Sequence, residues 1–346
     1  MSPDVLIVGS DALGTLESSY GKAFAGLGWH VSFWDPVQVA YRYTQGGRLG
    51  RMASNFVRIE PWLMKANRQL VVDVMNMRPQ LILTFTHTQL LTGALAQIRA
   101  ALDATLVQIW PDTMQNWRPV HSTNLPLYDL LATYSKASIP VFERLGAQRV
   151  AWLPLAADPE LHPVHAPHRP DLTADVSFIG GWRPEREAVL AQLEGFGLKI
   201  WGPEWDRYCR GNRFLMQAWQ GRPLRGIEFA QAVKGSKINL NIIDPTNFPA
   251  ANMRFFEIPI AGGLQVCSPC PELGTEFRHG EHLFYYRHQS EVSELLHKLI
   301  ADDTLRAKVS SAGHEQVLAN HTYTHRAHQL LELLDQNHGS SSHFLR

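Results

Sequence analysis

Residues 4–33 read DVLIVGSDALGTLESSYGKAFAGLGWHVSF, and this stretch decides the fold class. The apolar run VLIV at 5–8 ends at Gly9, and such short runs suit a strand that is buried on both faces of a parallel sheet. Apolar residues then recur at helical spacing as far as Leu27, and a second strand opens at Gly28. This order of strand, loop, helix and strand predicts the start of a doubly wound α/β fold.

The same alternation continues to about residue 153 and restarts at residue 175 with DVSFIGG. Further strands are expected at 79–85, 105–109, 127–131, 150–153, 198–201, 237–243 and 264–267. Further helices are expected at 90–102, 184–193, 229–233, 254–261, 292–301, 304–319 and 323–336. Between the two runs, residues 154–170 contain five prolines and no apolar periodicity, which is typical of a linker.

The length also favours two domains, because a single core rarely grows beyond roughly 250–300 residues and the chain has 346. We expect two Rossmann-like domains that face each other across a cleft and share one ligand at the carboxyl ends of their strands. The expected parts are an N-terminal domain at 1–154, a linker at 155–170, a second Rossmann-like domain at 171–325, and a C-terminal helix and tail at 326–346 that packs back on the first domain.

The charge balance narrows the function classes. Lys and Arg number 32, as do Asp and Glu, so the net charge of zero argues against a nucleic-acid partner. The three cysteines argue against a disulfide framework and favour a reducing, cytoplasmic location. The longest apolar stretch, around 90–110, is interrupted by Arg99 and Asp103, so we expect no membrane span and leave peripheral association open.

The loop GSDALG at 9–14 does not have the G-x-G-x-x-G spacing of a dinucleotide fingerprint, because its glycines are five residues apart. A glycine turn ahead of a helix nevertheless offers backbone N–H groups to an anion, so Gly14 is a candidate for donor binding. A tight turn without any ligand explains the loop equally well.

The segment NMRFFEIPIAGG at 252–263 is more informative. A loop leads into a helix that ends at the glycine pair, and Arg254 and Glu257 share one helical face. One interpretation places the helix N-terminus against a diphosphate and lets Glu257 accept hydrogen bonds from ribose hydroxyls. The alternative is a salt bridge on a solvated helix face, which contributes a few tenths of a kcal/mol.

With KINLNII at 237–243, PELGTEFRHGEHLFYY at 271–286 and AGHEQVLANHTYTHR at 312–326, this segment resembles the CgeB-like (spore-maturation) glycosyltransferases. These are relatives of the family-4, group 1 glycosyltransferases. FIGGWRPERE at 178–187 is similar to the opening of their nucleotide-binding domain. The resemblance implies a GT-B fold in which the domain at 1–154 is the acceptor side and the domain at 171–325 binds the nucleotide-sugar. It also implies a retaining, metal-independent hexosyltransferase. Such an enzyme uses a nucleotide-diphosphate-sugar co-substrate, no other cofactor, and an acceptor that is a glycan, a protein or a small molecule.

The resemblance also implies donor-binding residues. In the family's Glu-x7-Glu motif, Glu257 matches the second carboxylate, whereas the first position falls on Pro249. The family's basic pair after the glycine turn maps onto Gly181 and Arg186, and Arg183 is the expected replacement for the lost member. The remaining donor-binding candidates of the two motifs are Gly180, Asn252, Met253 and Arg254.

Catalytic candidates come from the first half of the chain. Asp112, in IWPDT, follows a strand and is a candidate base or acceptor-binding group, although a loop-capping role explains it equally well. His87, in TFTHTQ, also follows a strand, where ligands collect, although a lone histidine is more often structural. Trp182 and Trp201 are candidate sugar platforms, with core burial as the alternative.

Other readings remain. His321 and His325 are four residues apart, but no third ligand accompanies them, so we expect no metal. A nucleotide-sugar epimerase of GT-B fold is an alternative enzyme, and a non-catalytic nucleotide-sugar-binding protein is favoured if Pro249 has abolished catalysis. A nicotinamide oxidoreductase would need the fingerprint that the first loop lacks.

Overall fold

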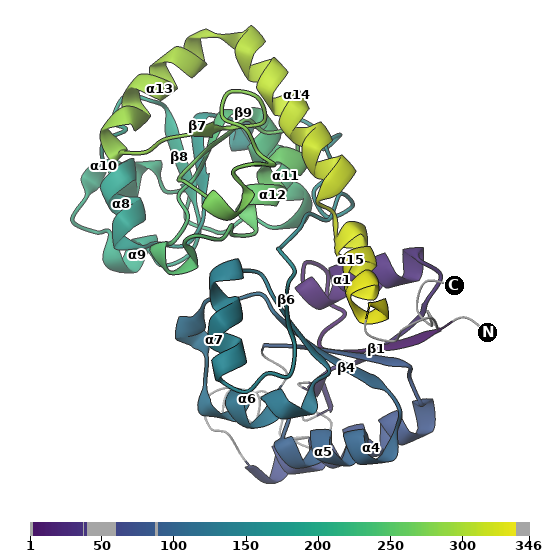
Figure 1. Cartoon of the computed structure of the whole chain (residues 1–346). Coiled ribbons are helices and arrows are strands. Elements are labelled where there is room, and N and C mark those ends of the chain that lie inside the picture. The colour runs from purple at the N-terminus through teal and green to yellow at the C-terminus, as the bar shows by residue number, and fades with distance from the viewer. Residues whose placement is uncertain (1–2, 37, 40–59, 87–88, 337–346) are drawn as a thin grey trace. The chain divides into compact units, whose positions relative to one another are not determined.

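The computed structural model describes residues 3–36, 38–39, 60–86 and 89–336 (Figure 1). The chain divides into two compact units: unit 1 comprises Met1–Leu153 and Ala327–Arg346, and unit 2 comprises Pro154–Arg326. Residues 155–170, expected as a linker, group with unit 2, and the first three of them are buried.

Unit 1 is built around a parallel six-stranded sheet of order β2-β1-β3-β4-β5-β6. The strands are β1 (Asp4–Val8), β2 (His30–Trp34), β3 (Leu81–Phe85), β4 (Thr105–Trp110), β5 (Leu130–Thr133) and β6 (Val150–Trp152). The helices are α1 (Leu16–Gly26), α4 (Glu60–Met77), α5 (Thr92–Ala101), α6 (Pro119–Asn124) and α7 (Ile139–Arg144). The helix α15 (Tyr323–Asp335) begins in unit 2 and continues into unit 1.

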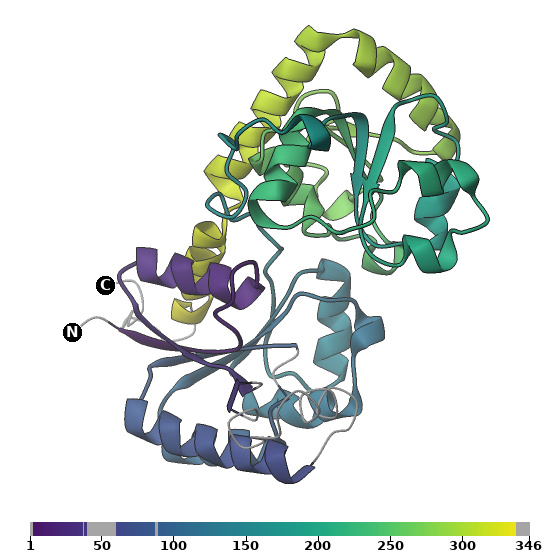
Figure 2. The same cartoon turned by 180° about the vertical axis from the view of Figure 1, so that it is seen from behind.

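Helices cover both faces of this sheet. α4 and α5 lie along one face and α1 lies on the other (Figure 2). Leu6 of β1 packs with Leu70 of α4 and Leu95 of α5, so the apolar sides of these elements form one core. The C-terminal half of α15 is anchored to the sheet, because Arg149 donates through Nη2 to the Leu333 carbonyl at 2.5 Å.

Unit 2 has a parallel five-stranded sheet of order β11-β10-β9-β7-β8. Its strands are β7 (Ala174–Ile179), β8 (Leu198–Trp201), β9 (Ser236–Asn241), β10 (Gln265–Cys267) and β11 (Phe284–Tyr285). Its helices are α8 (Pro184–Leu190), α9 (Trp205–Tyr208), α10 (Arg213–Ala218), α11 (Gly226–Gly235), α12 (Arg254–Ile260), α13 (Gln289–Ala301) and α14 (Asp303–Asn320).

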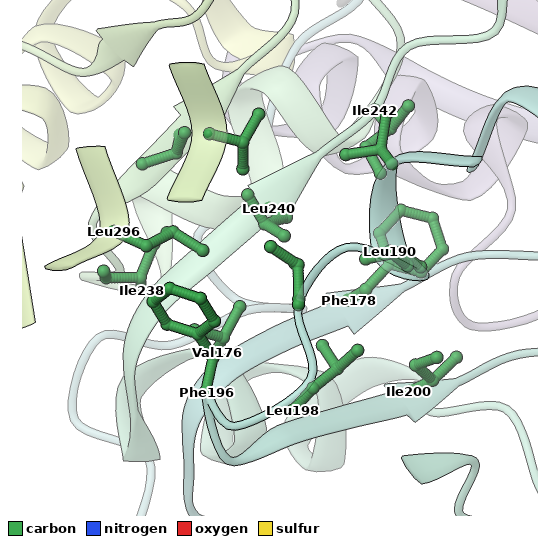
Figure 3. Close-up of a cluster of buried hydrophobic side chains, with 14 of the residues drawn as sticks. Val176, Phe178, Leu190, Phe196, Leu198, Ile200, Ile238, Leu240, Ile242 and Leu296 are labelled. Atoms are coloured by element: carbon green, nitrogen blue, oxygen red, sulfur yellow. The ribbon is translucent and has the colours of Figure 1, made fainter. Parts of the chain in front are cut away.

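The β-branched and leucine side chains of β7, β8 and β9 form the main core of unit 2 (Figure 3). Phe178, Leu198 and Leu240 point to the same side of the sheet, where Leu190 of α8 and Leu296 of α13 cover them. The opposite face packs against α11 and α12. The expected α/β class with two parallel, Rossmann-like sheets is therefore confirmed.

Several details differ from the expectations, and the short elements α6, α7, α9, α10 and β11 were not expected. The strand expected at 127–131 begins later, at Leu130, because Pro126 lies in a 3₁₀ turn formed by Leu125–Leu127. The helix α4 was not expected either, although Leu70 and Val74 are four residues apart, share one face of the helix and are buried in the core of unit 1.

Candidate functional site

The candidate site lies at the point of the unit 2 sheet where the strand order reverses. β7 is the first strand of this sheet, and its two neighbours, β8 and β9, run on opposite sides of it. In open α/β sheets, ligands bind outside the carboxyl ends of the strands at such a point. The loops that leave β7 and β9 here are residues 180–183 and 242–253.

The loop after β7 is held close to its neighbours by glycines. A Cβ at Gly202, directly after β8, would lie 1.9 Å from the Gly180 carbonyl oxygen. The same carbonyl accepts a hydrogen bond from Trp205 Nε1 at 3.0 Å. Gly181 meets only Pro203, with no atom nearer than 3.5 Å to an added Cβ. The backbone of Gly180 is therefore fixed by contacts that leave no room for a side chain at position 202.

Arg186, in α8, joins the two loops of the site. Its Nη1 donates to the Gly181 carbonyl at 2.8 Å and its Nε donates to the Ile242 carbonyl at 3.2 Å. Burial lowers the pKa of the Arg186 guanidinium; the carboxylate of Asp244 raises it, and the positive charges of Arg183 and Arg254 lower it further. Three guanidinium groups are thus close enough to influence one another at the carboxyl ends of β7 and β9.

Arg183 is half-exposed and pairs with carboxylates rather than with the backbone of the second loop. Its Nε donates to Asp244 Oδ2 at 3.2 Å, and its Nη1 lies 3.6 Å from Glu204 Oε2. The pKa of Asp244 is lowered because hydrogen bonds from Thr246 and Arg183 outweigh burial, which by itself would raise it. The sequence reasoning missed Asp244, although an acid directly after a buried strand is a usable signal.

Arg254 and Glu257 form an ion pair, in which Arg254 Nη1 donates to Glu257 Oε2. Arg254 also donates through Nε to the Ile179 carbonyl at 3.2 Å, and its guanidinium lies 4.5 Å from the centre of the Phe229 ring. Glu257 is only 5% exposed. The pair therefore does not sit on a solvated helix face, as the simpler interpretation required.

The entry into α12 is fixed by a pair of amides. Asn252 Nδ2 donates to Asn241 Oδ1 at 2.9 Å, and Asn241 Nδ2 returns a bond to Asn252 Oδ1 at 3.0 Å. Asn252 Oδ1 also accepts from the Phe255 amide at 3.1 Å. Asn252 thus anchors the loop, and Met253 follows it at the N-cap position of a helix that is seven residues long.

His162 is a second residue that the sequence reasoning missed. It is 4% exposed, its ring lies 4.7 Å from that of Phe229, and its Nδ1 has no hydrogen-bond partner among the described residues. Burial lowers the pKa of His162, while the charge of Glu257 raises it and that of Arg254 lowers it. Nothing in the Pro-rich segment around His162 signals that it reaches this cluster.

The other candidates belong to unit 1 of the chain, whereas this cluster belongs to unit 2. Asp112 accepts from the Thr113 amide and from Asn116 Nδ2, both at 2.7 Å, so it caps the loop after β4. Gly14 is exposed in the loop after β1, with a φ of +87°. His87 lies outside the described residues.

The two tryptophans have different environments. Trp182 stacks on Tyr208 with 4.6 Å between ring centroids and donates through Nε1 to Glu187 Oε2 at 2.6 Å. Trp201 is 1% exposed and belongs to the core between the sheet and α11. The expectation of a sugar platform at Trp201 is therefore wrong, because an aromatic face must be accessible in order to stack on a ligand.

The described residues contain neither a metal-binding cluster nor a membrane-spanning helix. No group of three or more His, Cys, Asp and Glu side chains there is arranged to hold a metal ion. None of the helices in this part of the chain is long and apolar enough to cross a bilayer.

Comparison with known proteins adds a family and a fold. Residues 184–332 match the family described as "Glycosyl transferase-like". No curated protein matches the chain. Among solved structures, sucrose-phosphate synthase from Thermosynechococcus elongatus superimposes with a TM-score of 0.64 at 14% identity, covering 99% of this chain and 100% of that one.

A glycosyltransferase from Rickettsia africae gives a TM-score of 0.66 at 10% identity, covering 98% of this chain and 100% of that one. Anabaena HepE, solved in complex with UDP and glucose, gives 0.60 at 14% identity, covering 97% of this chain and 100% of that one. The chain therefore has the two-domain GT-B fold, and its residues 184–332 are similar to the glycosyl transferase-like family.

Proposed function

We propose that the protein is a glycosyltransferase that moves a sugar from a nucleotide-diphosphate-sugar to an acceptor. The observation that carries this proposal is the group of Arg183, Arg186 and Arg254 at the strand-order reversal of unit 2. Arg186 and Arg254 lie within the segment 184–332 that matches the glycosyl transferase-like family, and Arg183 directly precedes it. A concentration of guanidinium groups at the carboxyl ends of parallel strands suits a diphosphate.

The three arginines have different roles in this proposal. Arg183 is half-exposed, and when the donor binds it gives up its hydrogen bond to Asp244 and donates to a phosphate oxygen instead. Arg186 holds the loops of the site together and adds positive charge. Charge placed in advance where the diphosphate leaves stabilises the transition state without reorganisation, which is the main catalytic effect available here.

Glu257 contributes to nucleoside binding in this proposal. Its Oε2 is engaged by Arg254, and no described residue donates to its Oε1, which is the atom we assign to the ribose hydroxyls. Arg254 keeps the carboxylate in place, so the salt bridge and the ribose contact are compatible. Gly180, Gly181, Asn252 and Met253 shape the loops around this position, and we assign Gly14, Asp112 and His87 to the acceptor side in unit 1.

The finer assignments follow from the resemblance to the CgeB-like enzymes. They are transfer of a hexose with retention of configuration, independence of metal ions, and a cytoplasmic location. UDP is the first nucleotide to test, because Anabaena HepE was solved with UDP-glucose. Pro249 stands where the family has its first carboxylate, which keeps a non-catalytic nucleotide-sugar-binding protein as the second candidate.

The test is a thermal-shift panel of UDP-, GDP-, dTDP- and CMP-sugars, followed by a product assay. A donor at about 100 times its Kd stabilises the folded state by about 2.7 kcal/mol, which such a panel detects. We expect one nucleotide class to stand out and its sugar to be transferred. Sugar isomerisation without an acceptor would indicate the epimerase, binding without turnover would indicate the non-catalytic protein, and stabilisation by none of the four would contradict the proposal.

A further inference from the structure

A third loop reaches the arginine site of unit 2, which consists of Arg183, Arg186 and Arg254. This loop, residues 202–204, follows β8, the strand that pairs with β7. Its last residue is Glu204, whose Oε2 lies 3.6 Å from Arg183 Nη1. Among the described residues, Arg183 is the only partner of the Glu204 side chain. The arginine site therefore includes a carboxylate to which the donor assignment gives no role.

The backbone holds Glu204 in this position at a conformational cost. Its φ is +70°, in the left-handed region that glycine favours and other residues rarely adopt. The preceding carbonyl, of Pro203, accepts from the Trp182 amide at 3.1 Å. The Glu204 carbonyl itself accepts from the amides of Arg207 and Tyr208 at 3.2 and 3.1 Å. The chain thus has a glutamate where a glycine would be less strained, and backbone outliers of this kind cluster at functional sites.

The three carboxylates of the site are held to different degrees. Glu257 is 5% exposed and forms a buried ion pair. Asp244 accepts at Oδ1 from the Thr246 amide at 3.0 Å and from Thr246 Oγ1 at 2.8 Å, so it keeps two hydrogen bonds when Arg183 leaves it. Glu204 has no second partner among the described residues, and its side chain is 44% exposed. Glu204 is therefore the carboxylate that turns into solvent most easily when an anion takes its place.

The side chains of the site carry no excess of positive charge. Three guanidinium groups face three carboxylates, and the exposed carboxylate of Glu185 adds a further negative charge near Arg186. A diphosphate must therefore compete with carboxylates for Arg183, and a larger negative charge on the ligand increases the repulsion. Each phosphate of a nucleotide-sugar carries a single charge, whereas the free terminal phosphate of a nucleoside diphosphate carries about −1.5 to −2. Glu204 thus opposes the nucleoside diphosphate more strongly than the nucleotide-sugar.

We propose that Glu204 is a counter-ion for Arg183 that favours binding of the nucleotide-sugar over retention of the nucleoside diphosphate. This inference rests on the proposed function, because the two ligands are the donor and the product of sugar transfer. Its consequence is faster release of the product, since the carboxylate returns to Arg183 as the diphosphate leaves. Glu204 acts through Arg183 and is therefore a positioning residue.

The test is calorimetric titration of the full chain with UDP, UDP-glucose and inorganic pyrophosphate. It is done at about pH 8, because the second pKa of a terminal phosphate is about 6. Glu204→Gln keeps the size of the side chain and removes its charge. We expect this variant to bind UDP about fivefold and UDP-glucose about twofold more tightly than the parent, which is the range of a half-exposed ion pair. Pyrophosphate should gain about as much as UDP.

Two further variants separate this role from a general effect of charge. In the double variant Glu204→Gln/Arg183→Ala, the gain should vanish, so that UDP binds as it does to Arg183→Ala alone, because Glu204 acts through Arg183. Glu281→Gln is the matched control. It removes a carboxylate of similar exposure, 46%, that pairs with Arg278 in the turn before β11, at the amino end of that strand. All three affinities should be unchanged in this control.

The proposal is overturned if Glu204→Gln binds UDP no more tightly than the parent does, if UDP-glucose gains as much as UDP, or if the gain persists without Arg183. Failure of the proposed function gives a different pattern. If neither UDP nor UDP-glucose binds but pyrophosphate binding still tightens in Glu204→Gln, the glycosyltransferase assignment falls and Glu204 remains the counter-ion of an anion site. If pyrophosphate does not bind either, both assignments fall.

Discussion

The sheets of the two units have the same strand order around their first strand, and their carboxyl ends carry opposite chemistry. In unit 2 the loops after β7 and β9 bring together three arginines and two carboxylates, each tied to a backbone carbonyl or to an opposite charge. In unit 1 the ends of β3 and β4 surround a cavity whose unpaired groups, Gln108 and Trp110, are uncharged. One topology thus supports a charged site and a neutral one.

This difference shows that the strand order decides where a ligand binds, while the side chains decide which ligand it is. The charged site of unit 2 suits the diphosphate of the proposed donor, whereas the unpaired groups of Gln108 and Trp110 in unit 1 carry no charge. The predictions below change one feature of this contrast at a time.

Gly202→Ala should have the largest effect, since its Cβ would lie 1.9 Å from the Gly180 carbonyl oxygen. The Gly202 Cα and the Gly180 carbonyl both belong to the backbone, so neither can move aside easily. We therefore expect the free energy of unfolding to fall by about 3 kcal/mol, the upper end of the usual cost of overpacking. Urea denaturation measures it. Gly211→Ala, where an added Cβ meets nothing within 4 Å, is the control. Equal stability of the two variants would show that the glycine loop of unit 2 is not fixed as described.

Arg186→Ala and Arg183→Ala should separate the structural from the binding role of the arginines. Each should weaken nucleoside diphosphate binding by about 1.5–3 kcal/mol, the size of a hydrogen bond to a charged group. Arg186→Ala should also lower the stability more than Arg183→Ala does, because Arg186 joins the carbonyls of Gly181 and Ile242, whereas Arg183 forms a half-exposed ion pair. Calorimetric titration and urea denaturation of both variants check this. If both variants bind the nucleoside diphosphate as tightly as the parent does, the charged site is not where the diphosphate binds.

Glu257→Gln should reduce the affinity for a ribonucleoside diphosphate by about 1–2 kcal/mol, because it removes the charge that accepts from the ribose. A 2′,3′-dideoxynucleotide should bind parent and variant alike, since it lacks the hydroxyl groups concerned. The ion pair with Arg254 is weakened in both measurements, so the dideoxynucleotide corrects for it. If the ribonucleotide binds both proteins equally, Glu257 does not contact the ribose and only pairs with Arg254.

Asp244→Asn should have the smallest effect, which is visible only in acid. The pKa of Asp244 is lowered from its ordinary value of 3.8, so its ionised form stabilises the fold at higher pH. That contribution is complete above pH 3.8 and is lost as the pH falls through the lower, folded-state pKa. Stability measured between pH 6 and 2.5 should therefore fall less steeply in the variant, by about 1 kcal/mol or less. Parallel curves would mean that the hydrogen bonds from Thr246 and Arg183 do not favour the ionised carboxylate of Asp244.

The sequence predicted the charged site better than the neutral one, for a physical reason. Arg183, Arg186, Arg254 and Glu257 follow buried strands or open helices within short motifs, so local order brings them to the carboxyl ends of β7 and β9. Asp244 follows the same rule and was overlooked. His162 does not: it reaches Phe229 from a segment without periodicity, through contacts between residues distant in sequence.

By itself, the sequence determined the α/β class, the order of the strands β1 to β10 and the motifs at the ends of β7 and β9, because apolar periodicity and glycine position are local properties. The tertiary structure alone decided which polar groups are paired. Gln108 and Gln265 both lie in apolar strands, and nothing in either strand shows that one is satisfied and the other is not. Burial and hydrogen bonding depend on what the neighbouring strands and helices bring, so the contrast between a charged and a neutral site appears only after folding.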